Sequence, residues 1–521
     1  MMFFVPAGYI SSRPWYSTDS TWFAGQADLK VGGIVSQIKA FMHSDEDAQL
    51  LVLNYAPGLR RRLHRLGIFD ANYWSFFDAL QGLEDDYTRP LNFLDLEWPD
   101  DVSFHYNPFL VTVMREDHPY ARVYLSREGT LQSIRFYGSG MPMVERVFDD
   151  RGFPSSVLMF DENGQPASQY YMNKAGDVIV SEDVPSGQII VVQNDDDRFE
   201  QPFYDSWGEL CGEFLSKHLA SHGNKGAGDT LVLGLSPHHN NIVAGALTDQ
   251  TLVLSRSTAI DDDDTSADLI ARAGAVFTDT RGTDAADDDP LAAFDEWALK
   301  PTLTIYPLER RPTFGASANE ATDFISLFVD TMSMEELDMA IATMAGQLVD
   351  DEKSRLLVCT MRSNDVDYIA QLKTVIGAYQ NFDLSFLGDE LLTQLGADLG
   401  ATETPEEKIQ ITYLDKDADL LATMAKTRVF VDLGQPVNYR LATEAVNAGV
   451  PQINRYEQEF ITRPINGYVV SDLSDLGTAL NYYLGGLEHW NQSLVQCRVL
   501  QDLFRPSEIL DRWELLKGVA A

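Results

Sequence analysis

Short apolar runs alternate with amphipathic segments over two long stretches of this chain. In the first stretch, strand-type runs at residues 3–6 and 49–54 flank residues 34–42, where apolar positions recur at helical spacing. Strands that alternate with helices predict parallel βαβ units, so we expect an α/β domain here. Its other predicted elements are a basic amphipathic segment and two further strands, at residues 58–66, 230–235 and 251–254.

The pattern changes between residues 102 and 192. Short β-branched and aromatic runs are separated there by turn signals, and Gly129, Gly140, Gly152, Gly164 and Gly176 recur every eleven or twelve residues. That period corresponds to one strand plus one hairpin turn, so we predict an antiparallel β-meander inserted into the first α/β domain. Because its hairpins would pair mainly with each other, we expect the meander to be removable without opening the α/β core.

A second α/β alternation begins near residue 304. Its strands are predicted at residues 324–329, 355–359, 383–387, 409–413 and 429–432, and helical patterns follow at 472–484 and 492–516. We therefore predict two doubly wound Rossmann-type domains. The predicted boundaries are 1–101 with 193–303 for the first domain, 102–192 for the inserted sheet, 304–490 for the second domain, and 491–521 for a helical segment that crosses back to the first.

Residues 429–453 have the layout of a nucleotide-sugar site. They predict a strand, a loop, a helix closed by Gly449, and another strand. This unit resembles the C-terminal half of retaining GT-B glycosyltransferases, in which a Glu in the loop holds the donor sugar and a second Glu, eight residues on, holds the nucleotide ribose. Glu444 stands at the second place, but Pro436 stands at the first and offers neither a side-chain acceptor nor an N–H. The resemblance implies a GT-B-like α/β fold that lacks half of this carboxylate pair.

The segment at residues 329–337 can be compared with the same enzymes. They place an Arg and a Lys beside the nucleotide diphosphate, because the leaving group needs fixed positive charge. In this chain the Arg place aligns with Thr331 and the Lys place with Glu336. Ser333 and Glu336 also have the spacing of a helix capping box, which we predict to be the present role of the segment. Thr331, Glu336 and Pro436 are therefore the lost donor-site positions.

A donor site without its diphosphate clamp can still hold a neutral sugar, because sugar recognition relies on hydrogen bonds and aromatic stacking. The candidates for such a vestigial sugar site are Gly434, Asn438 and Glu444. We expect Glu444 to hydrogen-bond either an amide at a helix end or a ligand hydroxyl, since burying it unpaired would be costly. We assign no catalytic, cofactor-binding or metal-binding residue.

Composition and charge narrow the class of protein. The chain has 521 residues, 45% hydrophobic content and a net charge of −40, which suits two or three globular domains and disfavours nucleic acid as a partner. The separated cysteines Cys211, Cys359 and Cys497 suit a reducing cytosol better than a disulfide framework. No apolar run approaches the roughly 18 residues that a membrane span needs, so we expect a cytoplasmic protein.

Three further features have both a functional and a structural interpretation. The acidic runs at 194–197, 261–264 and 287–289 lack the alternating carboxylates and central Gly of a calcium loop, so solvated loops are favoured. His238 and His239 follow a strand at an edge where α/β folds bind ligands, but no third metal ligand is evident. The aromatic residues that could stack on sugar rings are more often core residues; they are Trp15, Tyr16, Trp22, Tyr73 and Trp74.

One family combines these features. Residues 6–9, 15–16, 51–57, 73–75, 148–153 and 163–166 resemble accessory secretory protein one, a component of the bacterial accessory Sec system that exports serine-rich-repeat glycoprotein adhesins. The resemblance covers almost the whole chain and is densest before residue 170. It implies a GT-B-like fold without transferase activity, in a cytosolic complex with accessory secretory proteins two and three. That complex engages the glycosylated adhesin on its way to the accessory Sec ATPase, and through it the chain can reach the membrane periphery.

Three classes of function stay open at this point. The resemblance and the lost donor positions favour a non-catalytic adaptor in glycoprotein export. Glu444 and the fold allow an active GT-B glycosyltransferase, which Thr331, Glu336 and Pro436 oppose. The third class is a non-catalytic subunit that tunes a partner glycosyltransferase, with the meander as its docking surface.

Overall fold

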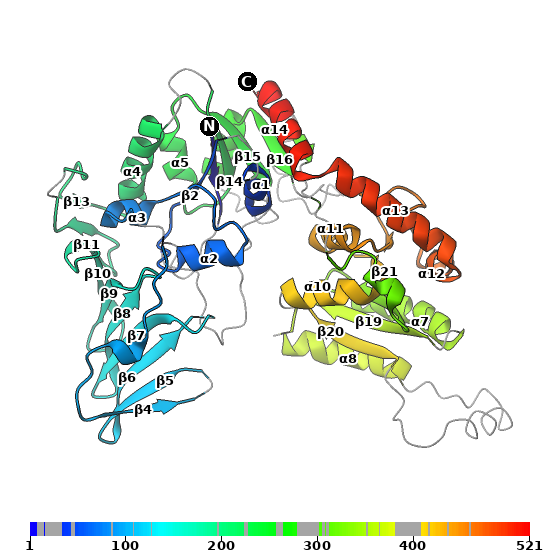
Figure 1. Cartoon of the computed structure of the whole chain (residues 1–521), viewed down its shortest axis with the longest axis horizontal. Coiled ribbons are helices and arrows are strands. Elements are labelled where there is room, and N and C mark those ends of the chain that lie inside the picture. Colours follow the sequence, from blue (N-terminus) through cyan, green and yellow to red (C-terminus); the bar gives the residue numbers. More distant parts are fainter. Residues whose placement is uncertain are drawn as a thin grey trace. The chain divides into compact units, whose positions relative to one another are not determined.

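The computed structural model divides the described chain into two compact units (Figure 1). The first unit holds the described residues 1–278, 302–304 and those from Ile509 onward, and the second holds those from 308 to Glu508. The described residues are 1–7, 15, 34–42, 47–84, 87–107, 109–126, 128–194, 197–222, 228–256, 264–278, 302–304, 308, 312–350, 353–363, 365–380, 408–414, 417–434, 437–457 and 460–520.

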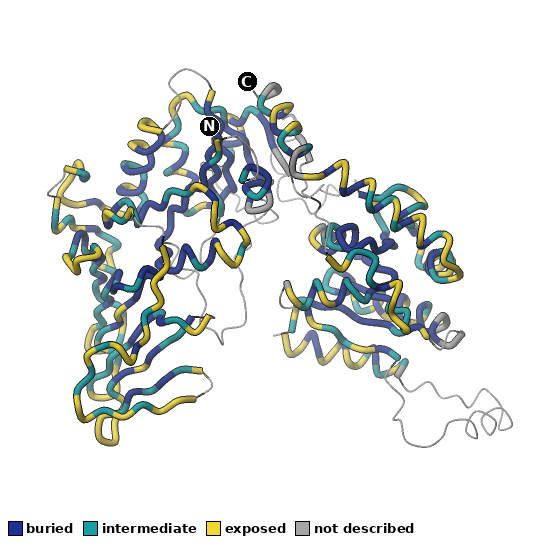
Figure 2. Tube along the Cα trace, in the orientation of Figure 1, coloured by how far each residue is buried: buried dark blue, intermediate teal, exposed yellow. Residues whose placement is uncertain are grey.

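The first unit is built on a seven-stranded parallel sheet with the strand order β17-β16-β15-β14-β1-β2-β3. Helices pack on both of its faces, so β1 (Met2–Val5) and β14 (Thr230–Gly234) are apolar and buried on both sides (Figure 2). The other strands are β2 (Ala48–Val52), β3 (Tyr73–Ser75), β15 (Thr251–Arg256), β16 (Ala275–Thr278) and β17 (Thr302–Thr304). The helices between them are α1 (Ile34–Phe41), α2 (Leu59–Arg65), α3 (Phe76–Gln81), α4 (Trp207–His222), α5 (Asn240–Ala246) and α6 (Asp264–Arg272).

Helix α14 (Pro506–Ala520) completes one face of this sheet from far along the chain. Trp513 is fully buried there, and its ring centroid lies 5.9 Å from that of Phe4 and 6.3 Å from that of Phe41. Its indole N–H, which needs a partner once buried, donates to Gln37 Oε1 at 2.9 Å. The C-terminal helix therefore belongs to the core of the first unit.

The predicted β-meander is confirmed as a ten-stranded antiparallel sheet in which successive strands pair in order, from β4 (Val102–Tyr106) to β13 (Phe203–Tyr204). The sheet thus extends beyond residue 192. One of its turns depends on Gly152, which has a φ of 86°, and a Cβ there would lie 2.7 Å from the carbonyl oxygen of Arg89. The strands between are β5 (Val111–Arg115), β6 (His118–Leu125), β7 (Leu131–Gly138), β8 (Met141–Phe148), β9 (Pro154–Phe160), β10 (Pro166–Met172), β11 (Val178–Asp183) and β12 (Ile189–Val191).

The meander shares a core with the parallel sheet, which argues against the expectation that it can be removed without opening that core. Tyr171 and Val180 of the meander lie in the same buried cluster as Phe3 of β1. Tyr55, which follows β2, donates its hydroxyl to Ser156 at 3.0 Å, and its ring lies 5.2 Å from that of Tyr171. Removing the meander would expose this shared apolar surface to water.

A cluster of buried charges also holds the turn between β8 and β9 against the first unit's helices. Arg60 of α2 donates to Asp150 at 2.5 Å and to Asp78 of α3 at 2.7 Å. Arg151 donates to Asp149 at 2.7 Å and to Asp78 at 2.8 Å. Burial raises the pKa of Asp150 to about 6, although the neighbouring Arg60 opposes this shift. The two guanidinium groups are therefore needed to compensate three carboxylates in a poorly hydrated place.

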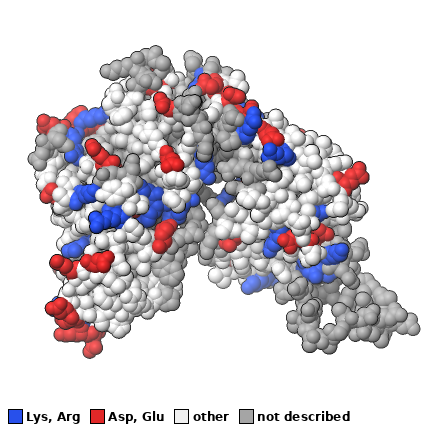
Figure 3. Space-filling view, viewed as in Figure 1, with Lys and Arg blue, Asp and Glu red and all other residues white. Residues whose placement is uncertain are grey.

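Closer to the surface, Lys and Arg side chains form a band across the first unit near the position of α2 (Figure 3). Arg65, in the last turn of α2, pairs with Glu128 of the meander at 2.8 Å, and both side chains are about one-third exposed. The same helix thus makes both buried and solvated charge contacts with the meander.

The second unit is built on a six-stranded parallel sheet with the order β20-β19-β18-β21-β22-β23. The predicted strand at 429–432 is confirmed as part of β21, and the predicted strand at 383–387 lies outside the described residues. The strands are β18 (Asp323–Phe328), β19 (Ser354–Thr360), β20 (Ile409–Tyr413), β21 (Thr427–Asp432), β22 (Gln452–Asn454) and β23 (Gly467–Val469). The helices include α7 (Met334–Asp350), α8 (Val366–Gln380), α10 (Asp417–Lys426), α11 (Tyr439–Ala448), α12 (Leu476–Leu484) and α13 (Leu487–Leu503).

Candidate functional site at the carboxyl edge of the second sheet

The predicted donor-site positions meet where β18, β21 and β22 end. Phe328, Asp432 and Asn454 are register partners across these three strands, so the segments that follow them start side by side. Open α/β sheets bind ligands at this carboxyl edge. Thr331 follows β18, and Gly434 follows β21. Pro436 lies outside the described residues.

Gly434 and Thr331 are in direct contact. A Cβ on Gly434 would overlap the Thr331 hydroxyl and lie 2.8 Å from the Thr331 carbonyl oxygen, so this position accepts only glycine. Thr331 Oγ1 is buried by the contact and has no hydrogen-bond partner among the described residues. Two of the predicted site residues are therefore brought together by packing, and neither presents a charged group.

Asp432 is the centre of this edge, and the sequence reasoning missed it. Its carboxylate is fully buried and accepts hydrogen bonds from Gly434 N at 3.2 Å and from Asn438 N at 2.9 Å. It thereby binds both sides of the loop that follows β21. Burial raises the pKa of Asp432 to about 7, although these two N–H groups favour the ionised form. The sequence does contain a signal for this residue, because Asp432 is an acidic residue directly after the apolar run at 429–431.

Asn454 is the register neighbour of Asp432 and was also missed. It is fully buried, and neither polar atom of its side chain has a hydrogen-bond partner within the described ranges. Unpaired polar groups in such a place are costly, so a bound water is the simplest way to satisfy them. The edge is thus polar beneath its surface.

Asn438 and Glu444 each have a hydrogen-bond partner in their own helix. The Asn438 side chain caps α11 by accepting from Leu441 N at 3.2 Å, which is the ordinary role of Asn at a helix start. Glu444 is half-buried and accepts from the Asn447 side-chain amide at 3.4 Å. The α11 boundaries follow from this cap and from Gly449, which ends the helix with a φ of 77°.

Glu336, which stands where GT-B enzymes carry a Lys beside the diphosphate, forms an ion pair with another residue of this chain. The predicted capping box is confirmed, because Ser333 Oγ accepts from Glu336 N at 3.2 Å and Glu336 Oε2 accepts from Ser333 N at 3.2 Å. The other Glu336 oxygen accepts from Arg455, just after β22, at 2.6 Å. The Arg455 hydrogen bond is the main reason why the pKa of Glu336 is lowered. Sequence reasoning missed Arg455, because nothing local links it to Glu336.

The other candidate residues have structural partners. His239 Nε2 lies 2.7 Å from the carbonyl oxygen of Gly234, and burial lowers the pKa of His239 to about 4. Trp74 stacks on His218 with ring centroids 4.5 Å apart, and Tyr73 accepts from Arg60 at 3.3 Å. No group of three or more His, Cys, Asp and Glu residues could hold a metal ion within the described part of the chain. Tyr16, Trp22 and the acidic runs at 261–263 and 287–289 lie outside the described residues.

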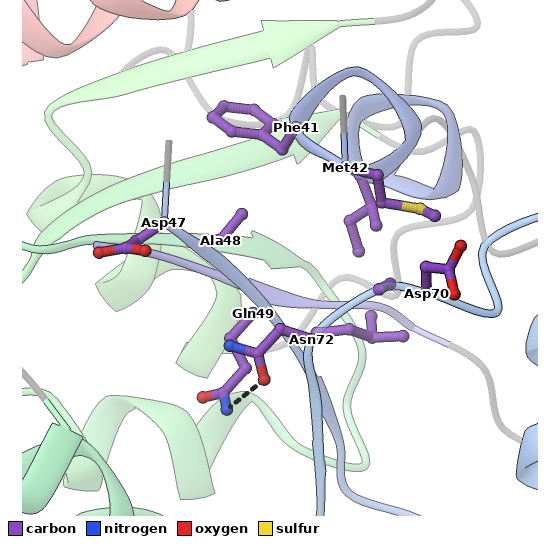
Figure 4. A pocket seen from close by; sticks show the side chains of 10 residues that line it. Phe41, Met42, Asp47, Ala48, Gln49, Asp70 and Asn72 are labelled. Atoms are coloured by element: carbon purple, nitrogen blue, oxygen red, sulfur yellow. Dashed lines mark hydrogen bonds between the residues drawn. The ribbon is translucent and has the colours of Figure 1, made fainter. Parts of the chain in front are cut away.

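A pocket of about 190 Å³ lies in the first unit, at the edge of the parallel sheet where the amino ends of β2 and β3 lie (Figure 4). It is lined by the end of α1 and by residues at the amino ends of β2 and β3, among them Phe41, Gln49 and Asn72. Gln49 donates to Asn72 at 3.2 Å across one side of it. Because ligands of open α/β sheets bind at the carboxyl edge, this pocket does not match a nucleotide-sugar site.

Helices long and apolar enough to cross a lipid bilayer are absent from the described residues.

Replacing Asp432 by Asn is expected to change how stability depends on pH. The folded carboxyl has a pKa of about 7 against an ordinary value of 3.8, so between these values the folded state binds more protons than the unfolded state. Its stabilising contribution is full below about pH 4 and is lost as the pH rises through about 7. Urea unfolding across this range should show the wild-type advantage over Asp432→Asn shrinking by a few kcal/mol. A difference that does not vary with pH would show that Asp432 stays ionised.

The two Rossmann-type sheets, the inserted meander and the carboxyl-edge site together define a GT-B-like α/β protein. The pneumococcal O-GlcNAc transferase GtfA, solved with UDP and GlcNAc, matches with a TM-score of 0.65 at 11% identity, over 99% of this chain and 98% of that one. TarM matches with a TM-score of 0.61 at 12% identity, over 99% and 98%. At these identities the likeness concerns the fold alone.

The chain belongs to the accessory Sec system protein one family, because the sequence model of that family matches residues 1–519. Family members from Staphylococcus aureus (strain NCTC 8325 / PS 47) and Streptococcus gordonii are 26% and 27% identical to it, each over 99% of this chain and over 99% and 98% of their own. A crystal structure of accessory secretory proteins one, two and three from Streptococcus pneumoniae matches with a TM-score of 0.79 at 24% identity, over 100% and 99%. Because it belongs to this family, this chain functions in the accessory Sec system.

Proposed function

We propose that this chain is a non-catalytic member of a cytosolic complex with accessory secretory proteins two and three. In this proposal the complex binds the glycosylated serine-rich-repeat adhesin and supports its transfer to the accessory Sec ATPase. Solved assemblies of family relatives support the choice of partners, since one contains accessory secretory proteins one, two and three together. The complex would bring the chain to the membrane periphery without a span of its own.

The observation that carries the non-catalytic assignment is the charge at the former clamp. A departing diphosphate needs fixed cations, yet Thr331 is neutral and Glu336 is acidic. Arg455 lies beside Glu336, and its charge is compensated by that carboxylate at 2.6 Å. A nucleotide diphosphate would have to compete with that carboxylate and with the field of a chain of net charge −40.

We expect the purified chain neither to hydrolyse nor to transfer from UDP-GlcNAc or UDP-glucose. Removing one preorganised electrostatic donor typically costs about 2.7–4 kcal/mol of transition-state stabilisation, and two positions have changed here. Release of UDP should stay at the level of a heat-killed control. Release above that level that disappears in Glu444→Ala would identify an active GT-B glycosyltransferase. Turnover by an added partner glycosyltransferase that rises with this chain would instead identify a tuning subunit.

The proposal includes weak contact between a neutral sugar and the residues Gly434, Asn438 and Glu444. Glu444 is half-buried and is the one carboxylate among these three residues, and a carboxylate can accept from a sugar hydroxyl. Repeats along the adhesin would add affinity through multivalency. Titrating glycosylated and unglycosylated repeat peptides into wild type, Asn438→Ala and Glu444→Gln separates the outcomes. Equal binding in every combination means that this edge is scaffold only and leaves the adaptor role to other surfaces.

A further inference from the structure

One face of the meander continues beyond the part that packs on the first parallel sheet. Register pairing joins Arg122, Arg135, Glu145 and Leu158 in one row across four neighbouring strands, β6 to β9. Side chains two residues apart on a strand share a face, so Val147, which is in the shared core, lies on the same face as Glu145. The outer part of this face carries arginines and aromatic rings.

The arginines of this outer part are held against aromatic rings. The Arg135 guanidinium carbon lies 5.7 Å from the ring centroid of Tyr124 and 5.5 Å from that of Phe160, so the group is flanked by rings from two strands. Arg122 lies 5.1 Å from the ring centroid of Tyr137. Stacking of this kind fixes a guanidinium in place while its N–H edge stays available for a carboxylate.

Charged side chains of both signs lie on this face, and one arginine of its outer part has no carboxylate partner among the described residues. Glu145 is buried and is bound by Arg135 through two hydrogen bonds of 2.9 and 2.7 Å, so one acid is neutralised by one arginine. Arg122 is exposed, and no carboxylate of the described residues lies within ion-pair distance of it. A positive charge without a carboxylate partner therefore remains at Arg122, in the outer part of this face, although the chain carries a net charge of −40.

We infer that this arginine–aromatic face, made of Arg122, Tyr124, Arg135, Tyr137 and Phe160, docks an acidic surface of a protein partner. The exposed Arg122 and the half-buried Tyr124 and Tyr137 lie near Met143, which is 52% exposed, and all are of residue types enriched at protein interfaces. A sugar ligand fits less well, because the arginines already stack on the rings that would have to stack on a sugar. The inference rests on the proposed function, in which accessory secretory proteins two and three are the partners.

The opposite face of the same sheet offers a matched control. Arg146 is also exposed, and its guanidinium lies 5.4 Å from the ring centroid of Phe136. It follows Glu145 in β8 and so points to the other side, where its register partner Ile134 belongs to a separate buried cluster. Arg122 and Arg146 thus share exposure and an aromatic neighbour and differ in the face that they occupy.

The test is binding of the full-length chain to purified accessory secretory proteins two and three, at low and at high salt. We expect Arg122→Glu to weaken assembly about tenfold or more, with most of the loss at low salt, and Arg146→Glu to match the wild type. Thermal melting should show that both variants are folded.

Assembly that Arg122→Glu and Arg146→Glu leave equally intact would overturn this inference while the proposed function stands. Assembly that is absent even in the wild type would overturn both. If Arg122→Glu instead weakens only the binding of glycosylated adhesin peptide, the occupant is a glycopeptide and the assignment to an acidic protein is wrong.

Discussion

A chain from which residues 102–204 have been excised is expected to lose cooperative folding of its first unit. Tyr171, Val180 and Ile189 are buried in the cluster that also holds Phe3 and Leu51 of the parallel sheet. Each large apolar side chain removed from a core typically costs about 2–5 kcal/mol, and whole domains are stable by only about 5–15 kcal/mol. Circular dichroism and urea unfolding would show loss of the first transition, while the second unit retains its own.

Point variants give the matched comparison for this deletion. Tyr171→Ala should lower the free energy of unfolding by about 3 kcal/mol or more, because the ring lies between Tyr55 and Phe77 in the core. Tyr106→Ala in the same meander should change it by less than about 0.5 kcal/mol, because Tyr106 is 66% exposed. A deletion variant that still unfolds in two cooperative steps would show that the parallel sheet can close its core alone.

The second large effect is expected from Arg60→Ala. The Arg60 side chain is 5% exposed and its guanidinium binds Asp78 and Asp150, so its loss leaves buried carboxylates without their cation. Breaking a buried ion pair by removing one partner typically costs about 3–5 kcal/mol. Denaturant unfolding of the first unit at neutral pH measures this loss.

Arg65→Ala on the same helix is the control for Arg60→Ala. The pair that Arg65 forms with Glu128 is about one-third exposed, so its removal should cost no more than about 1 kcal/mol. Equal effects of the two substitutions would mean that water reaches the Arg60 cluster and screens it. Each substitution removes one arginine from the same helix, so a difference between their effects on the free energy of unfolding reports on burial of the charge.

Several strands of both parallel sheets, among them β1, β14, β18 and β21, could be predicted from the sequence because each is a short apolar run between turn signals. The short strands β3, β16, β17 and β23 were not predicted. The capping box at Ser333 and Glu336 could also be predicted, because it depends on a spacing of three residues. The core that the meander shares with the parallel sheet could not be predicted. Alternation of apolar and polar residues is the same whether the apolar face meets a second sheet or closes on its own hairpins.

The residues of the candidate site that the sequence did not reveal were missed for one common reason. Asp432 and Asn454 become neighbours only through the register of β21 and β22, and Arg455 reaches Glu336 across 119 positions of the chain. Comparison with GT-B enzymes directed attention to the positions where those enzymes carry functional groups. It could not reveal groups that this chain supplies from elsewhere, such as the carboxyl of Asp432 beneath the loop.

The placement of Trp513 has a consequence for synthesis on the ribosome. Phe4 and Phe41 are made early, but the side chain that covers them is made after some 470 further residues. Until then that face of the first sheet stays open to water and to other nascent chains, where an uncovered apolar surface favours aggregation. Translation that stalls before Trp513 would leave the sheet formed and the part of its apolar face under α14 uncovered, a state that chaperones and proteases recognise.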